Sequence, residues 1–321
     1  MNITVIGCGR WGSLITWYLD HIGHRVTLYG RAASPRMQAF LTTRQNDLLT
    51  LPESVALSTA LDAALESAET VIISIGSQSL RSLLGQSELQ ALRSRTVVLC
   101  MKGLEMGTGA RLSQIAAELL HPSNTVAVWL GPGHVQEFYR GIPNCMVIDS
   151  ENEDVKRRLV QAFSSDLIRF YYGGDMIGNE VGAAAKNVVG IAAGFLDGFE
   201  MSSLKGALMS RGTREVARLI KAMGGSELSA YGLCHLGDYE ATVFSPYSHN
   251  RQFGESFVRG QDYHQLAEGY YTVKALMLLG QRYGVELPIC KAVHDILYEQ
   301  AVPRDVLAAL LRRGLTEEFY D

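Results

Sequence analysis

The sequence of 321 residues lacks the features of disulfide-rich, zinc-binding and nucleic-acid-binding proteins. Its five cysteines are odd in number and widely spaced, and none forms a Cys-x-x-Cys pair. This pattern favours a reducing cytoplasm over a disulfide framework or a zinc site, so we expect no metal. The formal net charge of -4 and the pI of about 6.1 provide no general attraction to nucleic acid or to an anionic membrane.

The sequence also has no long apolar run, and we expect no leader at its N-terminus. The apolar segment Val181–Leu196 is too short and too interrupted by glycine for an easy membrane span. The chain enters a strand-like run at its second residue, so we expect no secretory signal. With 47% hydrophobic and 19% charged residues, the chain can bury sizeable cores. We therefore expect a soluble cytoplasmic protein of roughly two domains.

A glycine-rich turn follows the first predicted strand. Asn2–Ile6 is predicted to be a strand, Gly7-Cys-Gly9-Arg-Trp-Gly12 follows it, and a helix then leads to a second strand at Arg25–Tyr29. In a dinucleotide-binding βαβ unit, the first glycine makes the tight turn, the second lets a pyrophosphate approach the backbone, and the third lets the helix pack closely. The helix N-terminus then faces the phosphates. The alternative is a chance glycine turn, which the two flanking elements disfavour.

The second strand lacks the carboxylate that an NAD site usually offers to the adenosine ribose. The strand ends Tyr29-Gly30-Arg31, and Arg31, helped by Arg10, is suited to pair with a 2′-phosphate. The sequence therefore favours NADP over NAD, with NAD still possible. The alternative interpretation is that Arg31 is a solvated loop cation.

Further apolar runs continue the alternation of strands and helices. The predicted strands are Thr70–Ile75, Thr96–Cys100, Thr125–Leu130, Cys145–Asp149 and Leu167–Tyr171. Ligands of an open parallel sheet lie beyond the carboxyl ends of its strands. Lys102 and Gly131 follow two of these ends, on the same side as the glycine turn. We expect Lys102 to meet a substrate or cofactor anion; the alternative is an ordinary surface lysine.

The second half of the chain shows helical patterns without strand alternation. Glu180–Asp197 is rich in alanine, contains no proline and carries Lys186 and Asn187 in its middle, which predicts a helix. Its glycines allow neighbouring backbones to approach closely. Burial would move the pKa of Lys186 towards neutrality, as a proton-transferring lysine needs. The alternative is that Lys186 extends from a core helix to the surface.

A second polar cluster follows this helix. Gly237-Asp238 is typical of a turn followed by a helix-capping carboxylate. The functional interpretation is a carboxylate close to Lys186 that holds its charge state and orients it. The two roles are compatible with each other.

Together these motifs resemble the NAD(P)-dependent glycerol-3-phosphate dehydrogenase family. The resemblance extends from the turn at Gly7 to Glu286–Ile289 near the end of the chain. Its most specific parts are Lys102-Gly103, Gly131-Pro132, Lys186-Asn187, Arg211-Gly212, Gly232-Leu-Cys-His-Leu-Gly-Asp238 and Ser248-His-Asn-Arg251. The order and spacing of these motifs are more specific than the glycine turn alone.

The resemblance implies a role for each matching residue. Lys186 matches the general acid/base, Asp238 sits against it, and Lys102 contacts both substrate and cofactor. The remaining substrate contacts that it implies are Asn187, Gly131, Thr242, Ser248, His249 and Asn250. The remaining cofactor contacts are Gly7, Gly9, Arg10, Trp11, Gly12, Arg31 and Glu268. Hydride would pass from the nicotinamide to a ketone carbon while Lys186 protonates the oxygen.

Several departures from the family pattern cluster at the substrate site. His249 stands where the family has a phosphate-gripping arginine, Gly133 where it has a serine, and His235 where it has a glycine. We expect that His249 can still bind phosphate as a cation, more strongly at lower pH, and that Arg251 can reach in to help.

Three interpretations therefore remain. The first, which we favour, is a divergent enzyme that reduces dihydroxyacetone phosphate to sn-glycerol 3-phosphate. The second is a relative that acts on another small hydroxy or keto compound. The third is a dinucleotide-binding sensor without turnover, which would not need a proton donor.

The resemblance and the patterns predict the same architecture. We expect an α/β protein with a doubly wound Rossmann-like domain over residues 1–175 and an all-helical substrate domain over residues 176–321. A homodimer is expected because the family is commonly dimeric. The expected partner is a small molecule, such as a phosphorylated triose.

The first testable prediction concerns the cofactor. Because a cation replaces the acidic residue at the end of the second strand, we expect a lower Michaelis constant for NADPH than for NADH. Steady-state kinetics with the two cofactors check this, and a strong preference for NADH would overturn it.

Overall fold

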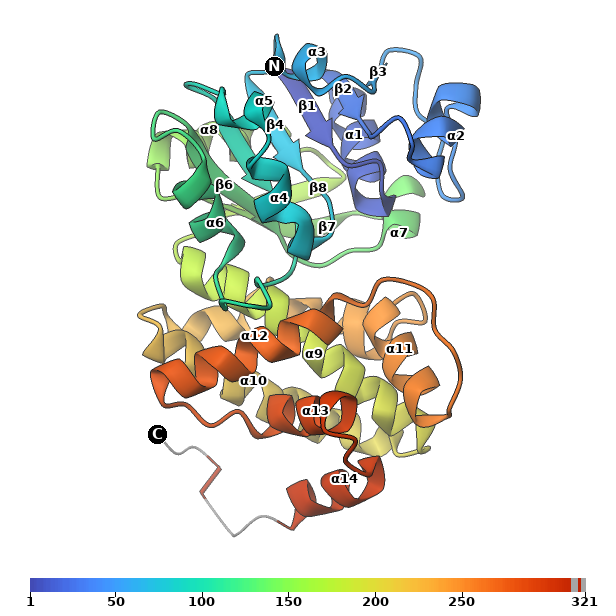
Figure 1. Ribbon diagram of the computed structural model, residues 1–321, viewed down its shortest axis with the longest axis vertical. Helices are drawn as coiled ribbons and strands as arrows, with labels where there is room; N and C mark the ends of the chain where they lie inside the picture. Colours follow the sequence, from blue (N-terminus) through green and yellow to red (C-terminus); the bar gives the residue numbers. More distant parts are fainter. Residues whose placement is uncertain (313–316, 319–321) are drawn as a thin grey trace. The chain divides into compact units, whose positions relative to one another are not determined.

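The computed structural model describes residues 1–312 and 317–318. The chain forms two compact units (Figure 1). The first comprises Met1–Met101 and Leu112–Met176, and the second comprises Lys102–Arg111 and the chain from Ile177 onward. The sequence-based division into residues 1–175 and 176–321 did not anticipate that a short segment from the middle of the first range packs within the second unit.

The first unit is built on one sheet. Its strands are β1 (Asn2–Ile6), β2 (Arg25–Tyr29), β3 (Ala56–Ser58), β4 (Thr70–Ile73), β5 (Thr96–Leu99), β6 (Thr125–Leu130), β7 (Asn144–Asp149) and β8 (Ile168–Tyr172). They lie in the order β3-β2-β1-β4-β5-β6-β7-β8. Neighbouring strands are parallel except β6 and β7, which pair antiparallel. The Rossmann-like prediction is confirmed, although the three-residue strand β3 was not expected from the sequence.

The helices of the first unit connect these strands. They are α1 (Arg10–His21), α2 (Pro35–Thr43), α3 (Leu61–Leu65), η1 (Ser77–Ser79), α4 (Leu80–Leu84), α5 (Ser87–Gln90), α6 (Leu112–Leu119), α7 (Val135–Tyr139) and α8 (Glu153–Phe163). Two begin at side-chain caps, because Ser34 accepts from the backbone of α2 and Asn152 from that of α8. The core buries Val5 and Trp129 of the sheet against Tyr18 of α1.

The second unit is helical. Its elements are α9 (Met176–Gly198), η2 (Ser202–Leu204), α10 (Lys205–Ala222), η3 (Glu227–Tyr231), η4 (Leu236–Asp238), the π-helical turn η5 (Glu240–Phe244), α11 (His249–Val258), α12 (Glu268–Tyr283), α13 (Pro288–Tyr298) and α14 (Pro303–Leu311). Its described residues contain no strand, only an isolated bridge between Leu104 and Arg111. Helix α9 runs through the middle of this unit and is buried along most of its length (Figure 1).

Small residues on α9 bring neighbouring backbones into direct contact with it. A Cβ at Gly194 would overlap the carbonyl oxygen of Arg251, and one at Gly254 of α11 would overlap that of Ile191. A Cβ at Gly190 would lie 2.8 Å from Cγ2 of Thr242. The close approach predicted from the glycines is confirmed, and it is this packing that places α11 and η5 against the face of α9 near Lys186.

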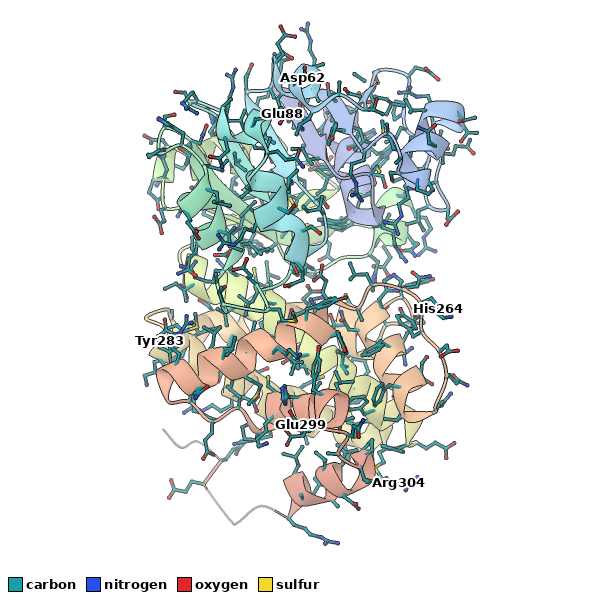
Figure 2. All side chains as sticks on the ribbon, in the orientation of Figure 1. Asp62, Glu88, His264, Tyr283, Glu299 and Arg304 are labelled. Carbon is teal, nitrogen blue, oxygen red and sulfur yellow. The ribbon has the colours of Figure 1, made fainter. Side chains whose placement is uncertain are left out.

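The charged groups of the two units divide between the surface and a few buried positions. Asp62 on α3, Glu299 after α13 and Arg304 on α14 are exposed (Figure 2). Helix α9, by contrast, buries Glu180 and Lys186. Among the described residues, none of the helices has the length and apolar character needed to cross a membrane.

The glycine packing generates a stability prediction. Gly194→Ala should destabilise the fold by about 1–3 kcal/mol, because the added methyl meets backbone atoms that cannot turn aside. Gly206→Ala on α10 is the matched control, since no atom lies within 4 Å of its Cβ position. It should be neutral or stabilising by up to about 1 kcal/mol. Urea unfolding of both variants checks this, and equal effects would contradict the packing argument.

Candidate functional site

Two lysines converge on one carboxylate in the second unit. Lys186 Nζ of α9 lies 2.9 Å from Oδ2 of Asp238. Lys102 Nζ lies 2.6 Å from the same oxygen. Lys186 also donates to Oγ1 of Thr242 at 2.7 Å, and that hydroxyl donates to the backbone oxygen of Asp238 at 2.7 Å. These four residues, predicted from separate motifs, therefore form one hydrogen-bonded cluster.

Burial dominates the ionisation of Lys186. The residue is only 7% exposed, so the interpretation in which its side chain reaches the surface is wrong. Desolvation lowers the pKa of Lys186 to about 8, although the charge of Asp238 raises it, and Lys102 lowers it further. A lysine in this state can give up and regain a proton near neutral pH.

The carboxylate of Asp238 pairs with both lysines. The helical turns η4 and η5 have no side-chain cap, so the predicted capping role of Asp238 is wrong. Its second oxygen, Oδ1, is buried and has no hydrogen-bond partner in the described chain. A buried carboxylate oxygen without a donor is costly, and a ligand hydroxyl would satisfy it.

A chain of amide groups joins Lys102 to the helices around α9. Asn187 Nδ2 donates to the backbone oxygen of Lys102 at 2.9 Å, and Asn250 Nδ2 donates to Asn187 Oδ1 at 3.1 Å. Asn250 Oδ1 in turn accepts from the backbone N–H of Gly269 at 2.9 Å. Glu268 is the first residue of α12, directly before Gly269. Both asparagines are therefore held in fixed orientations next to the lysine pair.

The segment Lys102–Arg111 is anchored in the second unit. Leu104 is fully buried in the core that contains α9. Arg111 Nη1 pairs with Oε2 of Glu180 at 2.6 Å, and Arg282 donates to the backbone oxygen of Thr108 at 2.9 Å. These contacts explain how a lysine that closely follows β5 comes to lie beside Lys186.

The predicted phosphate end lies at the start of α11. Ser248 caps this helix by accepting from the N–H of Arg251 at 3.3 Å. The ring Nδ1 of His249 lies 2.6 Å from the hydroxyl of Tyr263, which also donates to Gln252 Oε1 at 3.2 Å. Sequence reasoning missed Tyr263, because a tyrosine in an irregular loop has no spacing that relates it to His249.

Arg251 pairs with two carboxylates of the second unit. Its guanidinium contacts Oδ2 of Asp197 at 2.8 Å, Oε2 of Glu255 at 2.9 Å and the backbone oxygen of Ser245 at 3.0 Å. Lys205 contacts the same Asp197 oxygen at 2.6 Å. Burial raises the pKa of Asp197, but hydrogen bonds from Lys205 and Arg251 outweigh it and hold that pKa below its usual value. Arg251 therefore joins the first turn of α11 to Asp197 of α9.

Two departures from the family pattern have local structural explanations. Gly133 has a φ of 143°, and a Cβ there would overlap the ring of Phe138, so serine does not fit in this conformation. His235 is fully buried and bonded on both sides, so its bulk is accommodated within the core of the second unit. Neither departure by itself requires a different substrate.

The glycine turn of the first unit fits a dinucleotide. Gly7 has a φ of 119°, and a Cβ there would overlap the carbonyl oxygen of Ser74. A Cβ at Gly12 would overlap the carbonyl oxygen of Gly7. The position above Gly9 is open, with only Nη1 of Arg36 within 4 Å, at 3.7 Å. Helix α1 begins directly after Gly9, and the first turn of a helix presents N–H groups that suit phosphate.

The other predicted cofactor and substrate residues of the first unit follow the ends of strands β1, β2 and β6. Arg10 and Trp11 open α1, and the indole Nε1 of Trp11 is buried without a hydrogen-bond partner in the described chain. Arg31 is exposed after β2, as a 2′-phosphate ligand must be. Gly131 follows β6 with a φ of 128°. Across the described residues, no group of three or more His, Cys, Asp or Glu side chains is arranged to hold a metal.

Comparison with known proteins assigns both units to one family. A model of the NAD-dependent glycerol-3-phosphate dehydrogenase N-terminus matches residues 2–156, and one of the C-terminus matches residues 175–317. A glycerol-3-phosphate dehydrogenase (NAD(P)+) from Thermoanaerobacter sp. (strain X514) is 32% identical over 331 residues, covering 100% of this chain and 99% of its own. One from Nitrosomonas eutropha is 34% identical and covers 98% of each chain.

A solved structure is similar over the same extent. The crystal structure of glycerol-3-phosphate dehydrogenase from Coxiella burnetii superposes with a TM-score of 0.89 at 27% identity. The superposition covers 97% of this chain and 99% of that one. The arrangement of a Rossmann-type sheet followed by a helical unit is therefore shared with a solved member of the family.

Proposed function

This chain belongs to the NAD-dependent glycerol-3-phosphate dehydrogenase family, and we propose that it reduces dihydroxyacetone phosphate to sn-glycerol 3-phosphate with a nicotinamide cofactor. The observation that carries the proposal is the buried ammonium of Lys186, paired with Asp238 and poised to titrate near pH 8. A carbonyl reduction at neutral pH needs such a proton donor.

Three residues of the cluster have a part in the proton transfer. Protonated Lys186 gives a proton from Nζ to the carbonyl oxygen, and the neutral amine that results regains a proton from solvent. The ammonium of Lys102 stabilises the negative charge that develops on that oxygen. Asp238 holds both ammonium groups in place and presents its unbonded Oδ1 as an acceptor for a substrate hydroxyl. Bound reduced nicotinamide supplies the hydride.

The first unit supplies the groups for the cofactor. The turn from Gly7 to Gly12 would receive the pyrophosphate. Exposed Arg31 supports a preference for NADP over NAD, because a guanidinium forms strong charge-assisted hydrogen bonds to phosphate.

The N-terminus of α11 is proposed to receive the substrate phosphate. Ser248, His249 and Asn250 lie there, and Asn250 is joined to the lysine cluster through Asn187. A helix N-terminus favours an anion, which compensates in part for the missing arginine. His249, oriented by Tyr263, would add a positive charge at lower pH.

The central prediction is that Lys186→Ala strongly reduces turnover and leaves cofactor binding intact. We expect kcat with dihydroxyacetone phosphate and NADPH to fall by about 10²–10⁴-fold, because the proton donor is lost. For the unchanged protein, the rate of reduction should decline as the pH rises through about 8, where Lys186 loses its proton.

The matched control is Lys291→Ala, which removes an exposed lysine that pairs with Asp295 on the next turn of α13. Full turnover by Lys186→Ala would overturn the proposed role and favour a different proton donor. Tight NADPH binding without turnover at millimolar dihydroxyacetone phosphate in the unchanged protein would instead favour another small keto compound as substrate.

We also propose that the protein is a cytoplasmic homodimer. The expectation comes from the family, and free cysteines suit a reducing compartment. Light scattering during size-exclusion chromatography should give about twice the chain mass of 35.2 kDa. A monomeric mass at micromolar concentration would contradict the dimer.

A further inference from the structure

His235 joins the two elements that carry Lys186 and Asp238. Its Nδ1 lies 2.8 Å from the backbone oxygen of Gly182 on α9. Its Nε2 lies 2.8 Å from the hydroxyl of Tyr239, the residue that follows Asp238. The ring therefore spans the distance from one turn of α9 to the helical turn η4, and it does so without any exposure to solvent.

The hydrogen bonds define the protonation of this ring. A carbonyl oxygen only accepts, so Nδ1 of His235 must carry hydrogen and donate to Gly182. Burial lowers the pKa of His235 to about 4, so the ring is neutral and Nε2 accepts from Tyr239. Burial also raises the pKa of the Tyr239 hydroxyl, which keeps its proton for this bond. The ring therefore donates to Gly182 and accepts from Tyr239, whose hydroxyl also contacts Thr213.

The surrounding backbone is shaped to hold the ring. A Cβ at Gly182 would lie 3.0 Å from the Cβ of His235, and one at Gly212 of α10 would lie 3.3 Å from the Tyr239 hydroxyl. Alanine at either position would therefore crowd the pair. Glycine at these two helical positions, which is unfavourable for helix stability, is explained by the space that His235 and Tyr239 occupy.

His235 contacts α9 at Gly182, one helical turn before Lys186. In an α-helix the N–H of residue 186 bonds to the carbonyl of residue 182, so His235 shares the acceptor of the Lys186 amide. On the other side, Tyr239 continues directly from Asp238. Any change in the length of this bridge would alter the spacing of the Lys186–Asp238 pair.

We infer that His235 is a positioning residue: its ring fixes the spacing between Lys186 and Asp238 and excludes water from the core side of the pair. This inference deepens the proposed function and rests on it for the catalytic readout. His235 carries no charge in this role and transfers no proton.

The positioning role of His235 can be distinguished from an effect of charge, because the charged groups that face Lys186 belong to other residues. The carboxylate of Asp238 in η4 and the ammonium of Lys102 face it, and Thr242 of η5 adds a neutral hydroxyl. Removing His235 deletes none of these three groups, so the charges around Lys186 are unchanged. Water that enters the vacated space would find polar partners there and would restore solvation to Lys186.

The experiment compares His235→Gly with His235→Gln. Glycine removes the ring, so kcat should fall roughly tenfold to a hundredfold as the pair loses its spacing. The pKa of Lys186 should rise from about 8 towards 10.5. The decline in rate at alkaline pH should shift to higher pH by the same amount. Glutamine can donate to Gly182 and accept from Tyr239, so it should retain values close to those of the unchanged protein.

The pKa of Lys186 is measured without turnover, by competitive labelling with acetic anhydride over a range of pH and mass spectrometry of the labelled peptide. If the unchanged protein fails to reduce dihydroxyacetone phosphate, the proposed function falls while this labelling still tests the inference. His264→Gly is the matched control, because His264 is exposed (Figure 2).

The outcomes decide the inference in each case. A folded His235→Gly protein with unchanged kcat and labelling overturns it, as does an equal loss of activity in both variants with unchanged labelling. If His235→Gly does not fold, Tyr239→Phe decides, because it deletes one hydroxyl and preserves the ring. A several-fold lower kcat in Tyr239→Phe supports the inference, and an unchanged kcat overturns it.

Discussion

The structure of the second unit depends on one carboxylate shared by two ammonium groups. Asp238 offers a single oxygen to both Lys186 and Lys102, so the cluster as a whole keeps one unit of positive charge. Two lysines this close would repel each other without it. The residual positive charge suits a site where an oxygen becomes negative, and burial keeps Lys186 close to the point of losing its proton. Attraction and desolvation act in opposite directions on the same nitrogen, and their balance places the pKa of Lys186 at about 8.

This balance requires a helix that can be approached from several sides. Alanine and glycine along α9 let the backbones of α11, η5 and α12 reach it, which brings Thr242, Asn250 and Gly269 to the level of Lys186. Larger residues would hold those elements away and admit water. The poor helix propensity of the glycines is therefore a cost that tertiary packing offsets.

Much of the architecture could be predicted because its signals are local. The glycine turn at Gly7 imposes backbone demands that only glycine meets, and Lys186 stands out as the ammonium of an apolar helix. Strand β3 was missed because three residues show no periodicity. Tyr263 was missed because its partner His249 is fixed by tertiary contact, and the bulk of His235 was attributed to the substrate site although the ring lies in the core. Pairings across distant parts of the chain leave no spacing that a sequence can display.

Because the segment Lys102–Arg111 belongs to the helical unit, this unit is formed by two separate segments of the chain. A fragment that starts at residue 177 would lack Leu104 of the core, the partner of Glu180, and one of the two ammonium groups at Asp238. During synthesis on the ribosome, this segment emerges well before the helices that will enclose it. The second unit therefore consists of two separate stretches of polypeptide, and exchange of this unit between relatives by recombination must carry both of them.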